Sequence, residues 1–153
     1  MDASKLNAIL DRYRREPSSL LAILQDIQKE VNYLPKEDMK SVAKELDVPL
    51  SRVYALATFF SSFSLKPRGK HICTVCMGTA CHVRGAPKLV EKIERDFEVA
   101  AGGTTSDMKM TLETVNCVGA CALGPLVILD GDYHGNMTST KLDKVLQPLK
   151  KQG

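Results

Sequence analysis

The sequence predicts a mixed α/β (α+β) protein, with a helical region over residues 1–61 and an α/β module over residues 62–153. Two observations support this class. In the first region apolar residues recur every three or four positions, which is typical of amphipathic helices. In the second region they alternate with polar residues or form short runs, which is typical of strands. The period changes near residue 62, where we expect the domain boundary.

A bundle of about four helices is expected in the first region. Pro17 and Pro35 interrupt the apolar pattern and separate the first three segments. A break at Asp47-Val48-Pro49 precedes the fourth. The apolar stripes cover residues 6–13, 20–31, 39–46 and 51–60.

The second region is expected to form one small sheet with helices between its strands. Asp130-Gly131 is typical of a hairpin turn leading to Tyr133, and Pro148 should end or kink the last helix. The expected strands cover residues 63–65, 71–75, 108–115 and 126–129, and the expected helices cover residues 86–97 and 142–149.

Composition and charge exclude several classes of function. The chain has 44% hydrophobic and 25% charged residues, which is ordinary for a globular protein. A formal net charge of +3 is too small to indicate non-specific binding to DNA or to an anionic membrane. We find neither a secretory signal pattern nor an apolar stretch long enough for a membrane span. Five cysteines, an odd number, argue against a disulfide-bonded secreted scaffold, so we expect a cytoplasmic protein.

Four cysteines form two tight pairs, each just after a predicted strand. Cys76 and Cys81 are separated by four residues, and Cys117 and Cys121 by three. Loops that leave one edge of a sheet can bring four sulfurs together around a metal. Four thiolates suit a [2Fe–2S] cluster, and they also suit a structural zinc ion. The spacing favours iron–sulfur, because neither pair has the two-residue knuckle common in zinc sites, but zinc stays open at this point.

The remaining cysteine and the histidines are expected to have other roles. Cys73 lies inside a predicted strand and is interpreted as a packed core thiol, because a thioredoxin-like Cys-x-x-Cys motif normally opens a helix. A Rieske centre is excluded, since no histidine lies near Cys117 or Cys121. His82 directly follows Cys81, so we expect it beside the ligands and not among them.

Residues 39–60 also match the spacing of a helix-turn-helix. The segment 51–60 has a single basic residue, Arg52, and is rich in apolar and aromatic residues. Helices that read a DNA groove need donors and cations, so this one is interpreted as a docking surface for the α/β module or for a partner subunit. Gly102-Gly103-Thr104-Thr105 is too short for a nucleotide-binding loop, so the chain shows no NAD or flavin site of its own.

Several motifs resemble those of one family. The segment from Cys76 to Ala86 is similar to the first cluster motif of the thioredoxin-like [2Fe–2S] subunit of NADH:quinone oxidoreductase (complex I). Such subunits also occur in NAD(P)-linked, including electron-bifurcating, hydrogenases and in formate dehydrogenases. Phe60 stands where the family usually has tyrosine. The other matching segments are residues 58–60, 103–107, 111–113, 117–121 and 124–125.

The resemblance implies a thioredoxin-like [2Fe–2S] ferredoxin domain behind the helical region. It implies one [2Fe–2S] cluster and decides against zinc. It also implies a partner subunit that binds FMN, NAD(P)H and usually a [4Fe–4S] cluster, with no catalytic residue on this chain. The alternative is a zinc-stapled regulatory module with a helix-turn-helix-like N-terminal region. The implied ligands are Cys76, Cys81, Cys117 and Cys121, and amide donors to cluster sulfur are expected at Gly78, Thr79, Gly119 and Ala120.

Overall fold

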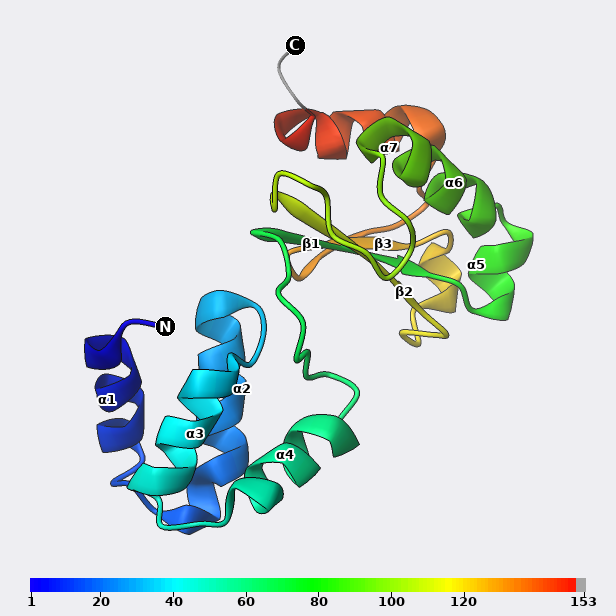
Figure 1. The fold of residues 1–153 in the computed structure, drawn as a ribbon. Helices are drawn as coiled ribbons and strands as arrows, with labels where there is room; N and C mark the ends of the chain where they lie inside the picture. The colour runs from blue at the N-terminus through cyan, green and yellow to red at the C-terminus, as the bar shows by residue number, and fades with distance from the viewer. Residues whose placement is uncertain (151–153) are drawn as a thin grey trace. The chain divides into compact units, whose positions relative to one another are not determined.

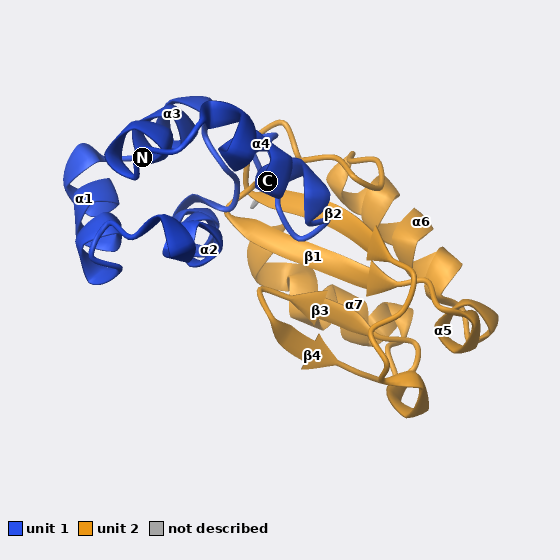
Figure 2. Ribbon diagram, turned by 90° about the horizontal axis from the view of Figure 1, so that it is seen from below, with its two compact units in different colours: residues 1–68 blue, residues 69–153 orange. Residues whose placement is uncertain are grey.

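In a computed structural model that describes residues 1–150, the chain divides into two compact units. Unit 1 covers residues 1–68 and unit 2 covers residues 69–153 (Figure 2). The boundary at residues 61/62 that we expect from the sequence differs by seven residues from this division. Each unit has its own hydrophobic core.

Unit 1 is entirely helical, as the sequence predicts (Figure 1). Pro17 begins a short 3-10 helix that leads into the second α-helix, and Asn32 ends that helix in the left-handed conformation (φ 66°). The Leu and Ile residues of the expected stripes form the core, with Leu10, Ile23, Leu24 and Ile27 fully buried. The elements are α1 (Ala3–Arg12), η1 (Pro17–Ser19), α2 (Leu20–Val31), α3 (Lys36–Glu45) and α4 (Leu50–Phe59).

The strand expected at residues 63–65 is wrong. Phe63 is buried in the core of unit 1. The Ser64 carbonyl accepts a hydrogen bond from the Leu34 amide (2.7 Å), and the Ser64 amide donates to Gln28 Oε1 (2.7 Å). Since Gln28 and Leu34 already bond both backbone groups of Ser64, these groups are not available to a strand partner.

Unit 2 contains a four-stranded sheet in the order β2-β1-β3-β4. The edge strand β2 (Met110–Val115) pairs in parallel with β1 (His71–Cys76), with His71 opposite Met110 and Cys76 opposite Val115. The strands β3 (Val127–Leu129) and β4 (Asp132–His134) add in antiparallel fashion. The Asp130-Gly131 hairpin is confirmed. Strand β2 begins two residues later than the start expected at residue 108, because Met108 adopts a positive φ of 56°.

A helical segment connects β1 to β2, another helix follows β4, and the helices cover one face of the sheet (Figure 1). The expected helices correspond to α6 and α7, and Thr138 caps α7 by accepting a hydrogen bond from the Lys141 amide (3.3 Å). Pro148 falls in a final 3-10 turn, which ends the regular helix early. The sequence did not indicate the short α5. The elements are α5 (Thr79–Val83), α6 (Ala86–Phe97), η2 (Cys121–Leu123), α7 (Ser139–Leu146) and η3 (Gln147–Leu149).

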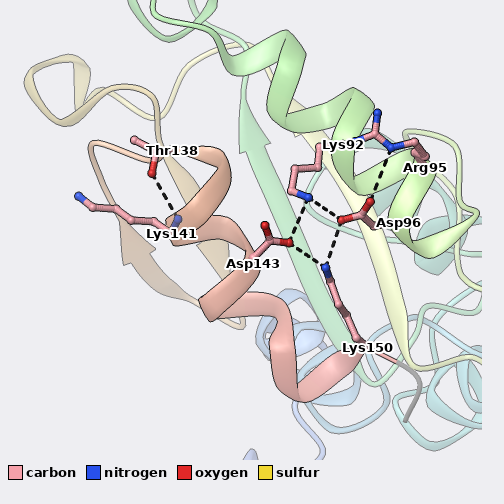
Figure 3. A network of polar contacts seen from close by, with 7 residues as sticks. All are labelled: Lys92, Arg95, Asp96, Thr138, Lys141, Asp143 and Lys150. Carbon is pink, nitrogen blue, oxygen red and sulfur yellow. Dashed lines mark hydrogen bonds and ion pairs between the residues drawn. The ribbon is translucent and has the colours of Figure 1, made fainter. Parts of the chain in front are cut away.

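Four charged side chains join α6 to the C-terminal helical segment (Figure 3). Lys92 Nζ lies 2.8 Å from Asp96 and 3.1 Å from Asp143, and Lys150 Nζ lies 3.2 Å and 2.7 Å from the same two carboxylates. Alternating charges at these distances form a closed ring across the two elements. Among the described residues, no helix is long and apolar enough to cross a membrane.

Candidate metal centre

The parallel pairing of β1 and β2 brings the two cysteine loops together. Cys76 is the last residue of β1 and lies opposite Val115, two residues before Cys117. The Met77 amide continues the ladder beyond the strand by donating to the Val115 carbonyl (2.8 Å). Because parallel strands end at the same edge of a sheet, both loops leave the sheet side by side.

The structure places the four expected thiols next to one another. Cys76 interacts with the thiols of Cys81 and Cys117, and Cys117 interacts with Cys121, so contacts connect all four sulfurs. Cys76 and Cys81 are buried, whereas Cys117 and Cys121 are exposed. Because one pair is buried and the other exposed, the site has one protected side and one open side. Within residues 1–150, no three His, Cys, Asp or Glu side chains are grouped so as to hold a single metal ion.

Backbone amides point at the sulfurs from several directions. The Gly119 amide donates to Cys117 Sγ at 3.3 Å. The amides of Gly78 and Val118 donate to Cys76, and that of Leu126 donates to Cys81. Gly78 and Gly119 are among the donors expected from the sequence. Val118 and Leu126 are not, because their positions depend on the path of the chain between β2 and β3. Amides so placed stabilise negative charge on sulfur.

These surroundings shift the thiol pKa values in different directions. Burial opposes ionisation of Cys76, but the Gly78 and Val118 amides and the neighbouring thiols outweigh it and lower its pKa. Burial and the Cys76 thiol raise the pKa of Cys81. The hydrogen bond with Cys117 and the charge on that residue raise the pKa of Cys121. Cys76 is thus the thiol most ready to ionise among these three.

Two glycines allow the loops to pack closely. A Cβ atom on Gly78 would lie 2.7 Å from the Asn116 carbonyl oxygen, in the loop that carries Cys117. A Cβ atom on Gly124 would lie 3.0 Å from Cys81 Sγ. A side chain at either position would push the two loops apart.

The fifth cysteine is a core residue, as the sequence predicts. Cys73 has no exposed surface and lies between Leu112 of β2 and Leu129 of β3. Burial raises its pKa to about 12. His71, on the same strand, pairs with Asp130 (Nδ1 to Oδ2, 2.6 Å), and His82 is exposed on α5. The structure therefore separates Cys73 from the quartet.

The donor set fits an iron–sulfur cluster. Four thiols come from two loops, and a row of amide N–H groups faces the sulfurs. Thiolate ligands with amide hydrogen bonds are the usual surroundings of [2Fe–2S] clusters. An open hollow of about 610 Å³ adjoins the site, and Cys117 and Cys121 lie in its wall.

A small α/β module with four thiols at the end of two parallel strands is the arrangement of a class of iron–sulfur electron carriers. Within that class, the chain belongs to the thioredoxin-like [2Fe–2S] ferredoxin family, whose model matches residues 6–150. This match confirms the family resemblance that the cysteine motifs indicate. It also confirms the thioredoxin-like ferredoxin fold, and its members carry a [2Fe–2S] cluster.

Individual relatives agree with the family. The chain is 38% identical over 127 residues to the NADP-reducing hydrogenase subunit HndA of Solidesulfovibrio fructosivorans, covering 83% of this chain and 74% of that one. It is 34% identical over 146 residues to the NADH-quinone oxidoreductase subunit designated E 2 of Rhizobium meliloti (strain 1021), covering 95% and 87%. A crystal structure of an NAD+-reducing [NiFe]-hydrogenase in the air-oxidized state has a TM-score of 0.76 at 17% identity. The match covers 88% of this chain but only 23% of the hydrogenase chain.

Proposed function

We propose that this chain is the one-electron carrier subunit of an NAD(P)H-linked oxidoreductase complex. It would exchange electrons with a partner subunit that binds FMN and NAD(P)H. The observation that carries this proposal is the quartet of thiols at the ends of β1 and β2 in a member of the thioredoxin-like [2Fe–2S] ferredoxin family.

Within the quartet, we assign Cys76 and Cys81 to one iron and Cys117 and Cys121 to the other. The assignment is supported by the two loops, each of which supplies one pair. It is also supported by the position of Cys73, which is buried between β2 and β3. When bound, a [2Fe–2S] cluster supplies a centre that accepts and releases single electrons.

The chain's own groups tune and protect that centre. The amides of Gly78, Val118 and Gly119 donate to thiolate sulfur, which favours added negative charge and raises the reduction potential. The buried thiols of Cys76 and Cys81 keep water from one side of the site. The exposed thiols of Cys117 and Cys121 mark the side that a redox partner can approach.

A partner with a flavin is required by the electron count. Nicotinamide delivers a hydride, which carries two electrons, and a flavin divides them into single electrons. The named relatives are subunits of a hydrogenase and of an NADH-quinone oxidoreductase, which supports a host complex of either kind, with a formate dehydrogenase as the third kind that the motifs allow. We propose that the exposed apolar surface at the end of α4 docks on the flavoprotein. Phe59 there is 79% exposed.

The zinc-stapled, DNA-reading alternative lacks support. The relatives and the family are redox proteins, and α4 contains a single basic residue, Arg52. A cytoplasmic location follows from the proposed role beside an NAD(P)H-binding subunit, and we propose it on that ground.

Metal analysis tests the proposal directly. The full chain, purified without oxygen, should be red-brown and contain about two irons and two acid-labile sulfides per chain. Reduction with dithionite should give the EPR signal of a spin-one-half [2Fe–2S] cluster. Single serine substitutions of Cys76, Cys81, Cys117 and Cys121 should each reduce the iron content. A colourless protein that holds one zinc per chain would overturn the proposal.

A further inference from the structure

One arginine connects the two segments that carry the thiols. Arg84 is the residue that ends α5, the helix of Cys81. Its Nη1 atom lies 3.1 Å from the Cys121 carbonyl oxygen, 3.3 Å from that of Gly124 and 3.5 Å from that of Ala122. A single guanidinium group thus reaches three carbonyls of the loop around Cys121.

These carbonyls have lone pairs that can accept from a donor outside their own loop. They belong to the 3-10 helix η2 and the residue after it, where the last carbonyls of a helix lack partners within the helix. The Cys121 carbonyl accepts the Gly124 amide (3.2 Å) as its local bond. All three contacts are made by Nη1, whose two N–H groups are held in the plane of the guanidinium and are shared among the carbonyls, whereas a lysine presents one compact ammonium on a flexible stem. Arginine is therefore suited to hold several carbonyls at once.

The contact spans a closely packed seam. On the same seam, Gly124 approaches Cys81 Sγ so closely that an added Cβ would lie 3.0 Å from the sulfur. Arg84 and Gly124 thus define the spacing between the Cys81 helix and the Cys121 loop, one by pulling the segments together and the other by leaving no room for a side chain.

Arg84 also brings a positive charge to the hollow that Cys117 and Cys121 line. It lines the open hollow that contains Cys117 and Cys121, and it is the one charged side chain among the described residues of that wall. Thiolates and a reduced cluster are anionic, so a nearby cation favours the reduced form. The hydrogen bonds of Arg84 and its charge therefore both act on the cluster site.

We propose that Arg84 is a positioning residue for the cluster site: it fastens the Cys121 loop to the end of α5 and raises the reduction potential through its charge. This inference rests on the proposed function, because the group it positions is the [2Fe–2S] cluster. The arginine itself ligates nothing.

Two variants separate the two effects. Arg84→Gln removes the charge and most of the donors, whereas Arg84→Lys keeps the charge and loses the planar arrangement. Arg95→Gln is the matched control. Arg95 lies in the last turn of α6, and its side chain is 73% exposed and contacts Asp96. All variants are made in the full chain, and circular dichroism checks that each is folded.

For the loaded chain, we measure the rate of iron loss to a chelator, the midpoint potential and the EPR line shape. Arg84→Gln should lose iron roughly tenfold faster, as is typical when a group that orients a metal ligand is removed. Its potential should become more negative. Arg84→Lys should lose iron faster than the wild type but keep a potential close to it. Arg95→Gln should match the wild type in every measurement.

A second readout does not depend on the metal. In the metal-free full chain, the Gly124 amide should exchange its hydrogen roughly tenfold faster in Arg84→Gln than in the wild type, because its acceptor loop is no longer fastened. Wild-type rates of iron loss and amide exchange in Arg84→Gln, with an unchanged potential, would overturn the inference. A wild-type chain without iron would instead overturn the proposed function, and the exchange comparison would still decide the role of Arg84.

Discussion

Gly124 lies so close to Cys81 that a Cβ atom at position 124 would be 3.0 Å from the cysteine sulfur. The two residues are 43 positions apart in the sequence. Their closeness shows that the loop after Cys121 packs directly on the helix that carries Cys81. The geometry of the site thus depends on a residue that has no donor atom in its side chain.

We expect Gly124→Ala to reduce iron content while the chain still folds. The methyl group would displace the Cys81 thiol or the Cys121 loop, and overpacking of this kind costs about 1–3 kcal/mol. Iron per chain and the urea midpoint measure the two effects. Gly69→Ala is the control, since its Cβ would lie 2.7 Å from the Met110 backbone, away from the thiols. It should lower stability but leave iron per folded chain unchanged. Equal iron loss in both variants would contradict the prediction.

Cys73 should behave as an inert core residue. Its pKa is raised to about 12 by burial, so at pH 8 almost none of it is the reactive thiolate. Iodoacetamide should therefore leave Cys73 unmodified in the folded metal-free chain, where Cys117 and Cys121 are exposed, and modify all five cysteines after unfolding, as located by mass spectrometry. Cys73→Ala should retain the iron content of the wild type. Loss of the cluster in that variant would show that the ligand quartet is misassigned.

The charge ring of Figure 3 should make stability depend on pH in a defined window. Lys92 lowers the pKa of Asp96, and Lys150 lowers that of Asp143, so their contribution exists above the usual carboxyl value of 3.8 and disappears as the pH falls below it. The pKa values of Lys92 and Lys150 are raised, so their contribution persists below 10.5 and disappears at higher pH.

Lys150→Met should therefore lower the urea midpoint at pH 7 and have a much smaller effect at a second pH well below 3.8, where the carboxylates become protonated. Lys144→Met, on the exposed face of α7, serves as the control and should leave the midpoint nearly unchanged. A midpoint difference for Lys150→Met that is the same at both pH values would show that packing, not charge, is responsible.

Asp130 should stabilise the start of β1. Its carboxylate accepts a hydrogen bond from the Ile72 amide (2.8 Å) and pairs with His71, and its own φ of 51° is left-handed. Asp130→Ala should cost about 1–2 kcal/mol in urea unfolding, since it loses the bonds and tolerates this φ poorly. Asp130→Asn, which keeps an acceptor and suits a positive φ, should cost less. Equal losses in the two variants would contradict this account.

Phe59 should contribute to docking and not to folding. Its ring is 79% exposed and touches Phe60 edge to face, with 5.0 Å between ring centroids. Exposed aromatic residues of this kind are typical anchors of protein interfaces. Phe59→Ser should weaken association with the flavoprotein subunit about tenfold or more in a pull-down titration, with iron content unchanged. Leu65→Ser, at a residue that is 40% exposed, tests whether any exposed apolar residue has the same effect.

Much of the fold follows from the sequence, because amphipathic period alone identifies the helices of unit 1 and the strands of the sheet's centre. The failures have local causes. The alternation of Phe63 and Leu65 imitates a strand, but Ser64 is hydrogen-bonded by Leu34 and Gln28 of unit 1. The short helix α5 has too few residues to show a period.

The site is predictable in part. Cysteine spacing indicates the quartet, and the structure brings those four thiols together, while their role as ligands remains our proposal. The amides of Val118 and Leu126 and the contacts of Arg84 could not be predicted, because they depend on how the Cys121 loop turns back toward α5. The distance between two loops depends on the tertiary structure, so a local sequence pattern does not predict it.

The pairing of Cys76 with Val115 across the parallel strands has a consequence for assembly. If β2 slipped by one residue against β1, the Cys117 loop would move by roughly 3.3 Å and every side chain of β2 would change face. The four sulfurs would then no longer meet. We therefore expect only a chain whose sheet has formed in the correct register to accept iron, so cluster content should report on the pairing of β1 with β2.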